Sequence, residues 1–173
     1  DQVQNFFKKN NISDSEIIVV DDGSDDNTHN IIKDIVNAGS DIKCIRHSGN
    51  LGIGMALLSG YKNAEKENVM MIPADGQFDI DELSENKNFS VNTYLAFYRK
   101  ELKDYTFFRK VVTGMNRTFN KYLLNLGIKD VNWVKAYKTS ELKSLDLKLE
   151  SSLLGSEICA KLNVKGTGAT EIP

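Results

Sequence analysis

The sequence predicts an α/β fold in which a mostly parallel sheet is flanked by helices, and two observations support this prediction. Over the first ~80 residues, short apolar β-branched runs alternate with amphipathic helical patterns, as in chains built from βαβ units. Acidic or glycine-rich segments follow these runs directly, and ligands of such sheets bind beyond the carboxyl ends of the strands. The length of 173 residues, of which 40% are hydrophobic and 27% charged, indicates one domain with its own core over residues 1–173.

The first half of the chain repeats one theme, in which an apolar run leads through a polar loop into a helical pattern. Residues 16–20 (EIIVV) end abruptly in DDGS, which is typical of a buried strand that runs into a loop. In residues 28–38, Ile and Val recur at i, i+1, i+4 and i+5, and Gly39 ends the expected helix. The expected elements are a helix at 2–10, a strand at 16–20, a helix at 28–38, a strand at 42–46, a helix at 55–66 and a strand at 69–72.

The second half is less regular. Its expected elements are a strand at 91–98, a helix at 105–126, a strand at 133–137 and helices at 140–144 and 151–162. The 105–126 segment carries apolar side chains at helical spacing, and its charged residues are all basic: Arg109, Lys110, Arg117 and Lys121. Such a segment either packs its apolar stripe into the core or lies at an anionic membrane surface, and the pattern alone leaves both open.

The composition argues against several classes of protein. A formal net charge of −2 gives no indication of a nucleic-acid partner. Cys44 and Cys159 lie far apart without CxxC spacing, which fits inert thiols in a reducing compartment. Because no run of 18 apolar residues occurs and the first residues lack a basic and an apolar region, we expect neither a transmembrane helix nor a signal peptide within these residues.

Carboxylates at the ends of expected strands are the strongest chemical signal. Asp21 and Asp22 follow the first apolar run, and Asp75 follows the third, with Asp79 four residues later. An isolated DDGS can simply start a turn and cap the next helix. Three acidic positions at the ends of strands in one layer favour a site instead, and oxygen ligands of this kind suit Mg²⁺ or Mn²⁺ beside a diphosphate.

A glycine-rich loop precedes the expected helix at 55–66. Asn50, Gly52 and their neighbours can direct backbone amides at a phosphate, although a loop that needs positive φ explains the glycines equally well. Neither GxxxxGK[ST] nor a complete GxGxxG is present, which argues against ATP hydrolysis and nicotinamide binding. His29 and His47 stand isolated in the sequence, so we expect them in loops or at the surface, and no Ser/His/Asp arrangement is evident.

Three segments together resemble, in order and spacing, the family 2 glycosyltransferases of GT-A fold, especially the dolichol- and polyprenyl-phosphate sugar transferases. The segments are EIIVVDDGSDDNT, IRHSGNLGIGMALLSGYKNA and VMMIPADGQFDIDEL. The likeness continues through residues 98–100, the region of Arg109, residues 129–137, Glu157 and residues 171–173, so it covers nearly the whole chain.

This resemblance implies an inverting transfer of a sugar from a UDP- or GDP-linked donor to a lipid phosphate or another acceptor. The residues expected at the nucleotide are Asp21, Asp22, Gly23, Ser24, Asn50 and Gly52. Asp75 matches the last carboxylate of the family's metal motif and is the expected ligand of a divalent cation, with Asp79 as a second one. A cation there would stabilise the departing nucleoside diphosphate.

Two departures from the family pattern matter. Pro73 stands where the metal motif begins with an aspartate, so Asp75 must share the cation with Asp79, Gln77 or diphosphate oxygens. The family also begins with a strand that carries a Pro-x-x-Asn-Glu segment, before the helix expected at 2–10, and that strand is absent from these residues. We therefore expect the sequence to be part of a longer chain.

The nature of the acceptor decides which further residues are needed. A lipid phosphate is ionised at neutral pH, so basic side chains must hold it, and the candidates are Arg99, Lys100 and Arg109. A sugar hydroxyl requires a general base, for which Asp130 or Glu157 is the candidate.

Three functions stay open on the sequence. The first is transfer to polyprenyl or dolichyl phosphate, with the protein in the cytoplasm at the inner face of a membrane. The second is transfer to a glycan hydroxyl, and the third is a catalytically silent nucleotide-sugar-binding module, which Pro73 encourages. A phospho-receiver module also places acidic residues after its strands, but it needs a Lys-Pro pair, and the chain has only Pro73 and Pro173.

Overall fold

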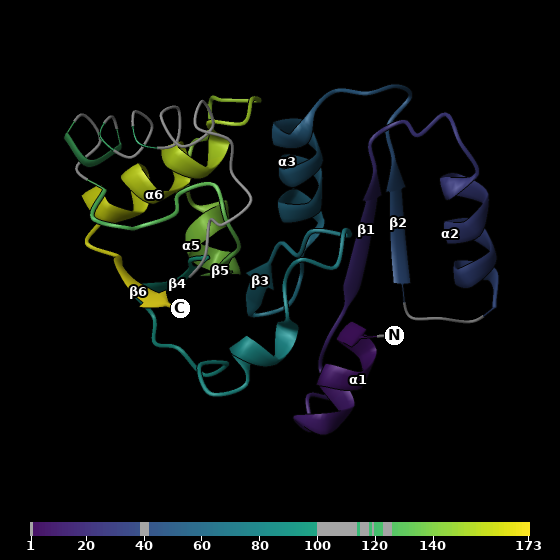
Figure 1. Ribbon diagram of the computed structural model, residues 1–173, viewed down its shortest axis with the longest axis horizontal. Helices are drawn as coiled ribbons and strands as arrows, with labels where there is room; N and C mark the ends of the chain where they lie inside the picture. Colours follow the sequence, from purple (N-terminus) through teal and green to yellow (C-terminus); the bar gives the residue numbers. More distant parts are fainter. Residues whose placement is uncertain (1, 39–41, 100–113, 115–117, 119, 123–125) are drawn as a thin grey trace.

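The computed structural model describes residues 2–38, 42–99, 114, 118, 120–122 and 126–173 (Figure 1). Its helices are α1 (Gln2–Lys9), α2 (Thr28–Asn37), α3 (Ile53–Asn63), the 3₁₀ helix η1 (Ile80–Leu83), α5 (Thr139–Lys143) and α6 (Leu154–Val164). Its strands are β1 (Ile17–Asp21), β2 (Ile42–Arg46), β3 (Asn68–Met70), β4 (Thr93–Phe97), β5 (Lys135–Lys138) and β6 (Gly168–Ile172). The predicted α/β class is therefore confirmed.

The described strands form two sheets. β1 and β2 pair in parallel, with Asp21 opposite Arg46 at their carboxyl ends. The other sheet has the order β3-β5-β4-β6, in which β5 runs antiparallel to both neighbours while β4 and β6 are parallel. A mostly parallel sheet is thus not confirmed, because the strand predicted at 69–72 pairs antiparallel with β5 instead of joining β1 and β2.

Most elements lie within a few residues of their predicted positions. The strand expected at 133–137 begins later, at Lys135, because residues up to Trp133 form a loop that contacts the end of β4. Two described elements were not predicted, η1 and β6, and the sequence GATEI of β6 lacks the apolar alternation that marks a strand. The predicted helix at 105–126 falls largely outside the described residues.

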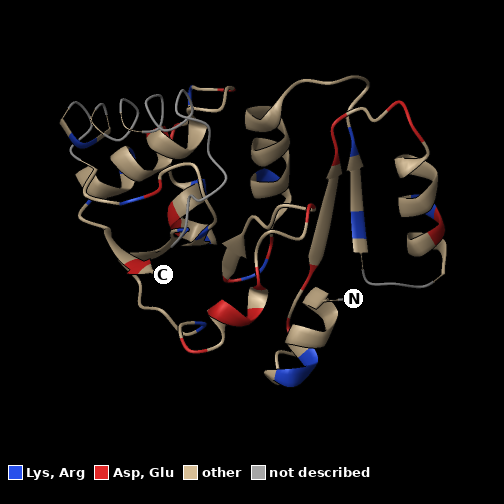
Figure 2. Ribbon diagram, in the orientation of Figure 1, with Lys and Arg blue, Asp and Glu red and all other residues tan. Residues whose placement is uncertain are grey.

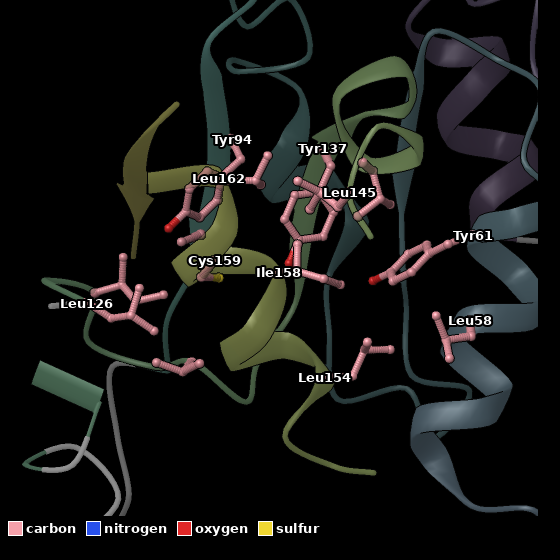
Figure 3. Close-up of a cluster of buried hydrophobic side chains, with 14 residues drawn as sticks. Leu58, Tyr61, Tyr94, Leu126, Tyr137, Leu145, Leu154, Ile158, Cys159 and Leu162 are labelled. Carbon is pink, nitrogen blue, oxygen red and sulfur yellow. The ribbon is translucent and has the colours of Figure 1, made fainter. Parts of the chain in front are cut away.

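One apolar core lies between α3, α6 and one face of the four-stranded sheet (Figure 3). Tyr94 and Tyr137 extend from adjacent strands toward Cys159 and Ile158 on α6, and Tyr61 reaches in from α3. The rings of Tyr61 and Tyr137 meet edge to face, with centroids 6.0 Å apart. This packing fixes α3, and with it the loop at its amino end, against the sheet.

A second apolar cluster lies around β4 and contains Phe6, Phe78 and Phe97. The ring of Phe78 meets Phe97 edge to face at 5.1 Å, and on another side it contacts Trp133 at 6.5 Å. The loop after β3 is thereby tied to the loop before β5. Within the described residues, no helix combines the length and the apolar character needed to cross a bilayer.

Candidate functional site

The carboxyl end of β1 places Asp21 in a buried position. Its Oδ1 accepts a hydrogen bond from the backbone N–H of Ser24 at 2.9 Å, and its Oδ2 lies 3.6 Å from Nε of Arg46 and 3.3 Å from Nδ1 of His29. The whole residue is only 3% exposed. Figure 2 shows acidic residues at this end of β1 and in the loop that leads to α2, beside a basic residue at the end of β2.

Asp22 faces the neighbouring loop and is held on both of its oxygens. Oδ1 lies 2.6 Å from Nδ1 of His47 and accepts from the N–H of Leu51 at 3.0 Å, while Oδ2 accepts from the N–H of Gly52 at 2.8 Å. The carboxylate therefore occupies the anion position at the amino end of α3. The N–H groups of Leu51 and Gly52, which this glycine-rich loop could have directed at a phosphate, donate to Asp22 instead.

Gly23 allows the loop after β1 and the loop after β2 to lie in contact. It has φ of +76°, and a Cβ atom there would lie 2.4 Å from the backbone carbon of Gly49 and 2.8 Å from the nitrogen of Asn50. Residues 21–24 and 49–52 thus form one unit, called the strand-end cluster below. The structure brings together all six residues predicted at the nucleotide.

Hydrogen bonding to Ser24 lowers the pKa of Asp21 below its ordinary value, and Arg46 lowers it further. Because the folded pKa is the lower one, ionised Asp21 stabilises the fold above an ordinary pKa of about 4, and this contribution is lost as the pH falls below that value. We expect the difference in unfolding free energy between wild type and Asp21→Asn to shrink from pH 6 to pH 3. Urea unfolding of both proteins from pH 6 to pH 3 measures this free-energy difference. A difference that stays constant over this range would contradict a lowered pKa of Asp21.

Asp75 and Asp79, the predicted metal ligands, lie exposed in the segment between β3 and η1. Oδ1 of Asp75 accepts from the N–H of Gln77, and Oδ1 of Asp79 accepts from the N–H of Asp81 at the start of η1. Within the described part of the chain, no three His, Cys, Asp or Glu side chains gather where they could hold a metal ion. Asp75 nevertheless offers a hard, exposed oxygen ligand, and Mg²⁺ commonly binds one or two carboxylates together with substrate phosphates, so the residues fit a cation shared with a diphosphate.

Arg99 and Asp130 form an ion pair beside an aromatic ring. Nε and Nη2 of Arg99 both donate to Oδ2 of Asp130, at 3.0 and 2.9 Å, and Oδ1 of Asp130 accepts from the N–H of Asn132. The guanidinium lies over the ring of Trp133, 4.4 Å from its centroid. Planar pairing and stacking together fix the orientation of this cation.

Arg99 and Trp133 border a pocket of about 260 Å³, called the aromatic pocket below. Its lining consists of Gln77, Phe78, Glu82, Tyr98, Arg99, Trp133 and Pro173. Gln77 also joins the pocket to Asp75 through the hydrogen bond between its N–H and that carboxylate. The predicted metal ligand and the predicted acceptor arginine therefore belong to adjacent parts of the surface.

A second cation lies close to the same region. Nζ of Lys129 is 3.9 Å from the ring centroid of Tyr98, and the N–H of Lys129 donates to Oε1 of Glu171. Sequence reasoning did not single out Lys129, Tyr98 or Trp133 as individual site residues. Basic and aromatic residues near Arg99 and Asp130 were the available signal, but it did not show which of them share a face.

Glu157, the alternative base, lies on α6 and is engaged elsewhere. Its carboxylate accepts from the N–H groups of Lys148 and Leu149 at 2.9 and 2.8 Å and from Nζ of Lys161 at 2.6 Å. Burial raises the pKa of Glu157, but these partners lower it by more, so that it lies below the ordinary value. Glu157 is not among the residues that line the aromatic pocket. Its contacts hold the backbone of residues 148–149 in place.

Two predicted acceptor residues, Lys100 and Arg109, lie outside the described residues. His47 lies in the loop after β2, as expected, but it is not isolated, because its side chain is 9% exposed and bridges Asp22 and Ser59. His29 likewise lies 3.3 Å from Asp21. These contacts join residues far apart in the chain, and no local sequence pattern predicts them.

Comparison with known proteins agrees with this geometry. Residues 3–125 match the family described as glycosyl transferase family 2. Two Trichomonas vaginalis proteins named dolichyl-phosphate beta-glucosyltransferase, ALG5C and ALG5D, are 39% identical over 40% of this chain and 34% identical over 46% of it. The provisionally named glycosyltransferase CsbB of Bacillus subtilis is 29% identical over 70% of the chain.

The matched regions amount to 21%, 24% and 37% of these three relatives, so the chain spans well under half of their length. The family match itself covers more than half of this chain and includes β1, the strand-end cluster, the segment of Asp75 and Asp79, and Arg99. It implies the GT-A fold, to which the α/β architecture corresponds. The chain therefore belongs to glycosyl transferase family 2.

Proposed function

We propose that the protein transfers a sugar from a UDP- or GDP-linked donor to a polyprenyl or dolichyl phosphate, with inversion at the anomeric carbon. The strand-end cluster carries the proposal, because its acidic loop is packed against a glycine loop at the carboxyl ends of two parallel strands. Family membership and the names of two relatives favour a sugar transferase with a lipid-phosphate acceptor. Residues 1–173 would form its catalytic domain.

On the donor side, the two aspartates have different tasks. Asp22 uses its oxygens on His47, Leu51 and Gly52, so it shapes the glycine loop. Asp21 is fixed by Ser24 and Arg46, which leaves the exposed surface of residues 23–26 and 49–50 to receive the base and ribose. A divalent cation at Asp75 would neutralise charge on the departing diphosphate.

On the acceptor side, Arg99 is the candidate for holding a phosphate at the aromatic pocket. Asp130 and Trp133 fix the plane of its guanidinium, and Lys129 adds a second positive charge close by. A phosphate acceptor is already ionised, so its attack on the anomeric carbon requires orientation and charge stabilisation but no strong base. We propose that the protein works at the cytoplasmic face of a membrane, where such an acceptor is located.

A glycan hydroxyl as acceptor is the second candidate. Asp130 would then serve as the base, but both Arg99 donors converge on its Oδ2, and Oδ1 accepts from Asn132. A hydroxyl would have to displace one of these donors before the carboxylate could take its proton. The geometry therefore favours an ionised phosphate acceptor over a hydroxyl.

The test supplies labelled UDP- and GDP-sugars to the intact protein with membranes that contain polyprenyl phosphate. We expect an organic-soluble sugar-phosphate lipid to form. Labelling of only a soluble saccharide would reject the lipid acceptor, and binding of the nucleotide-sugar without any turnover would indicate a silent module.

Asp75→Ala probes the cation in the same assay. Because this carboxylate is the candidate ligand beside the leaving diphosphate, we expect about a 100-fold loss of turnover and a higher Mg²⁺ requirement. Asp14→Asn is the matched control, since Asp14 is exposed and pairs with Lys66. Equal activity of the Asp75 variant and its control would contradict a role at the cation.

A further inference from the structure

His47 lies at the centre of a hydrogen-bonded chain that joins three elements. Its Nδ1 is 2.6 Å from Oδ1 of Asp22 at the end of β1, and its Nε2 is 2.8 Å from Oγ of Ser59 in α3. Its backbone N–H donates to the carbonyl of Asp21 at 2.9 Å. The imidazole is almost fully enclosed, so this chain is part of the interior and not a transient surface contact.

Asp22 transmits the position of the imidazole to the glycine loop. The same Oδ1 that meets His47 also accepts from the N–H of Leu51, and Oδ2 accepts from the N–H of Gly52. Gly52 has φ of +90° and is the residue directly before α3. If the carboxylate turns, both amides lose their acceptor, and the loop that packs against Gly23 loses its support.

The order Ser59–His47–Asp22 is also the order of a nucleophilic relay, but its surroundings do not fit that chemistry. Ser59 lies in the interior of α3, where backbone N–H groups bond to carbonyls of the same helix. Such a position does not direct paired amides at an oxyanion, as acyl transfer requires. The relay is suited to holding Asp22 in place.

We propose that His47 is a positioning residue for the nucleotide donor: it holds Asp22, and through it the loop 49–52, in the geometry that receives a nucleoside diphosphate. This inference rests on the proposed function. The ring can donate from Nδ1 to Asp22 in both protonation states, while Nε2 accepts from the Ser59 hydroxyl when neutral and donates to it when charged.

Two substitutions separate the parts of this role. His47→Asn can still donate to Asp22 from its amide, but it does not reach Ser59. His47→Phe removes both hydrogen bonds. Asn63→Ala is the matched control on the helix of Ser59, because its exposed amide donates to the carbonyl of Ser59.

The experiment measures binding of UDP and of GDP to the intact protein by calorimetry, with Mg²⁺ present and at one fixed pH. We expect His47→Phe to bind about tenfold more weakly, as the loss of a charge-assisted hydrogen bond predicts. His47→Asn should recover most of this affinity, and Asn63→Ala should behave as wild type.

The outcomes separate this inference from the proposed function. If wild type binds neither nucleotide, the proposed function fails, and the inference fails with it. If wild type binds but His47→Phe binds as tightly, or His47→Asn binds no better than His47→Phe, only the role of His47 is overturned. Should His47→Phe fail to fold, His47→Gln takes its place, because its longer side chain carries the amide toward Ser59 and away from Asp22. It should bind more weakly than His47→Asn, and equal affinity of the two would overturn the role.

Discussion

Replacing Gly23 by alanine is expected to destabilise the fold strongly and to remove nucleotide binding. A Cβ atom at this position would lie 2.4 and 2.5 Å from the backbone carbon atoms of Gly49, which cannot swing aside as a side chain can. The backbone φ of +76° adds conformational strain for any residue with a Cβ. Together these effects should cost roughly 4 kcal/mol of unfolding free energy, measured by urea denaturation at pH 7.

Two other glycines separate the causes. Gly76 has a similar φ of +74°, but a Cβ atom there meets nothing within 4 Å, so Gly76→Ala should cost only about 1 kcal/mol. A Cβ atom at Gly49 also meets nothing within 4 Å, so Gly49→Ala should change stability by less than about 0.5 kcal/mol. Equal losses for Gly23→Ala and Gly76→Ala would show that the close approach of the two loops is not what stabilises the strand-end cluster.

This cluster also shows how far sequence reasoning reaches. The strands β1 and β2 and the helix α2 lie within about a residue of their predicted bounds, because each carries a complete apolar period and a clear end signal. The position of Asp21 and Asp22 at a strand end follows from the same local pattern. The partners of Asp22 do not follow from this local pattern. His47 and Leu51 lie in the loop after β2 and come close to Asp22 only when the chain has folded.

The order and direction of the strands in the sheets could not be predicted from the sequence, for a related reason. An apolar run such as that of β3 indicates a strand, but it does not say which strand lies beside it or in which direction. β6 was missed altogether, because its first three residues are exposed and only Ile172 is buried, so it has no apolar alternation. Pairing between strands that are far apart in the sequence, such as β4 and β6, decides both the order of the strands and the presence of β6.

Replacing Asp130 by asparagine is expected to weaken use of the acceptor by one to two orders of magnitude. Oδ2 accepts twice from Arg99, and Oδ1 accepts from the N–H of Asn132. An amide has only one acceptor oxygen, so its NH₂ group must face either Arg99 or Asn132 as an unmatched donor. The guanidinium would then lose its orientation over Trp133, which should raise the KM for polyprenyl phosphate more than it lowers kcat.

Steady-state kinetics of the intact protein with a nucleotide-sugar and polyprenyl phosphate check this. Asp146→Asn is the matched control, because Asp146 is exposed, pairs with Lys148 and does not line the aromatic pocket. If Asp130 were a general base for a hydroxyl acceptor, kcat would fall by 10²–10⁴ with little change in KM, and the acidic limb of the pH–rate profile would disappear. A rise in acceptor KM, together with an unchanged donor affinity, instead assigns Asp130 to orienting Arg99. The comparison therefore decides between the two acceptor chemistries, because a phosphate requires an oriented cation and a hydroxyl requires a base.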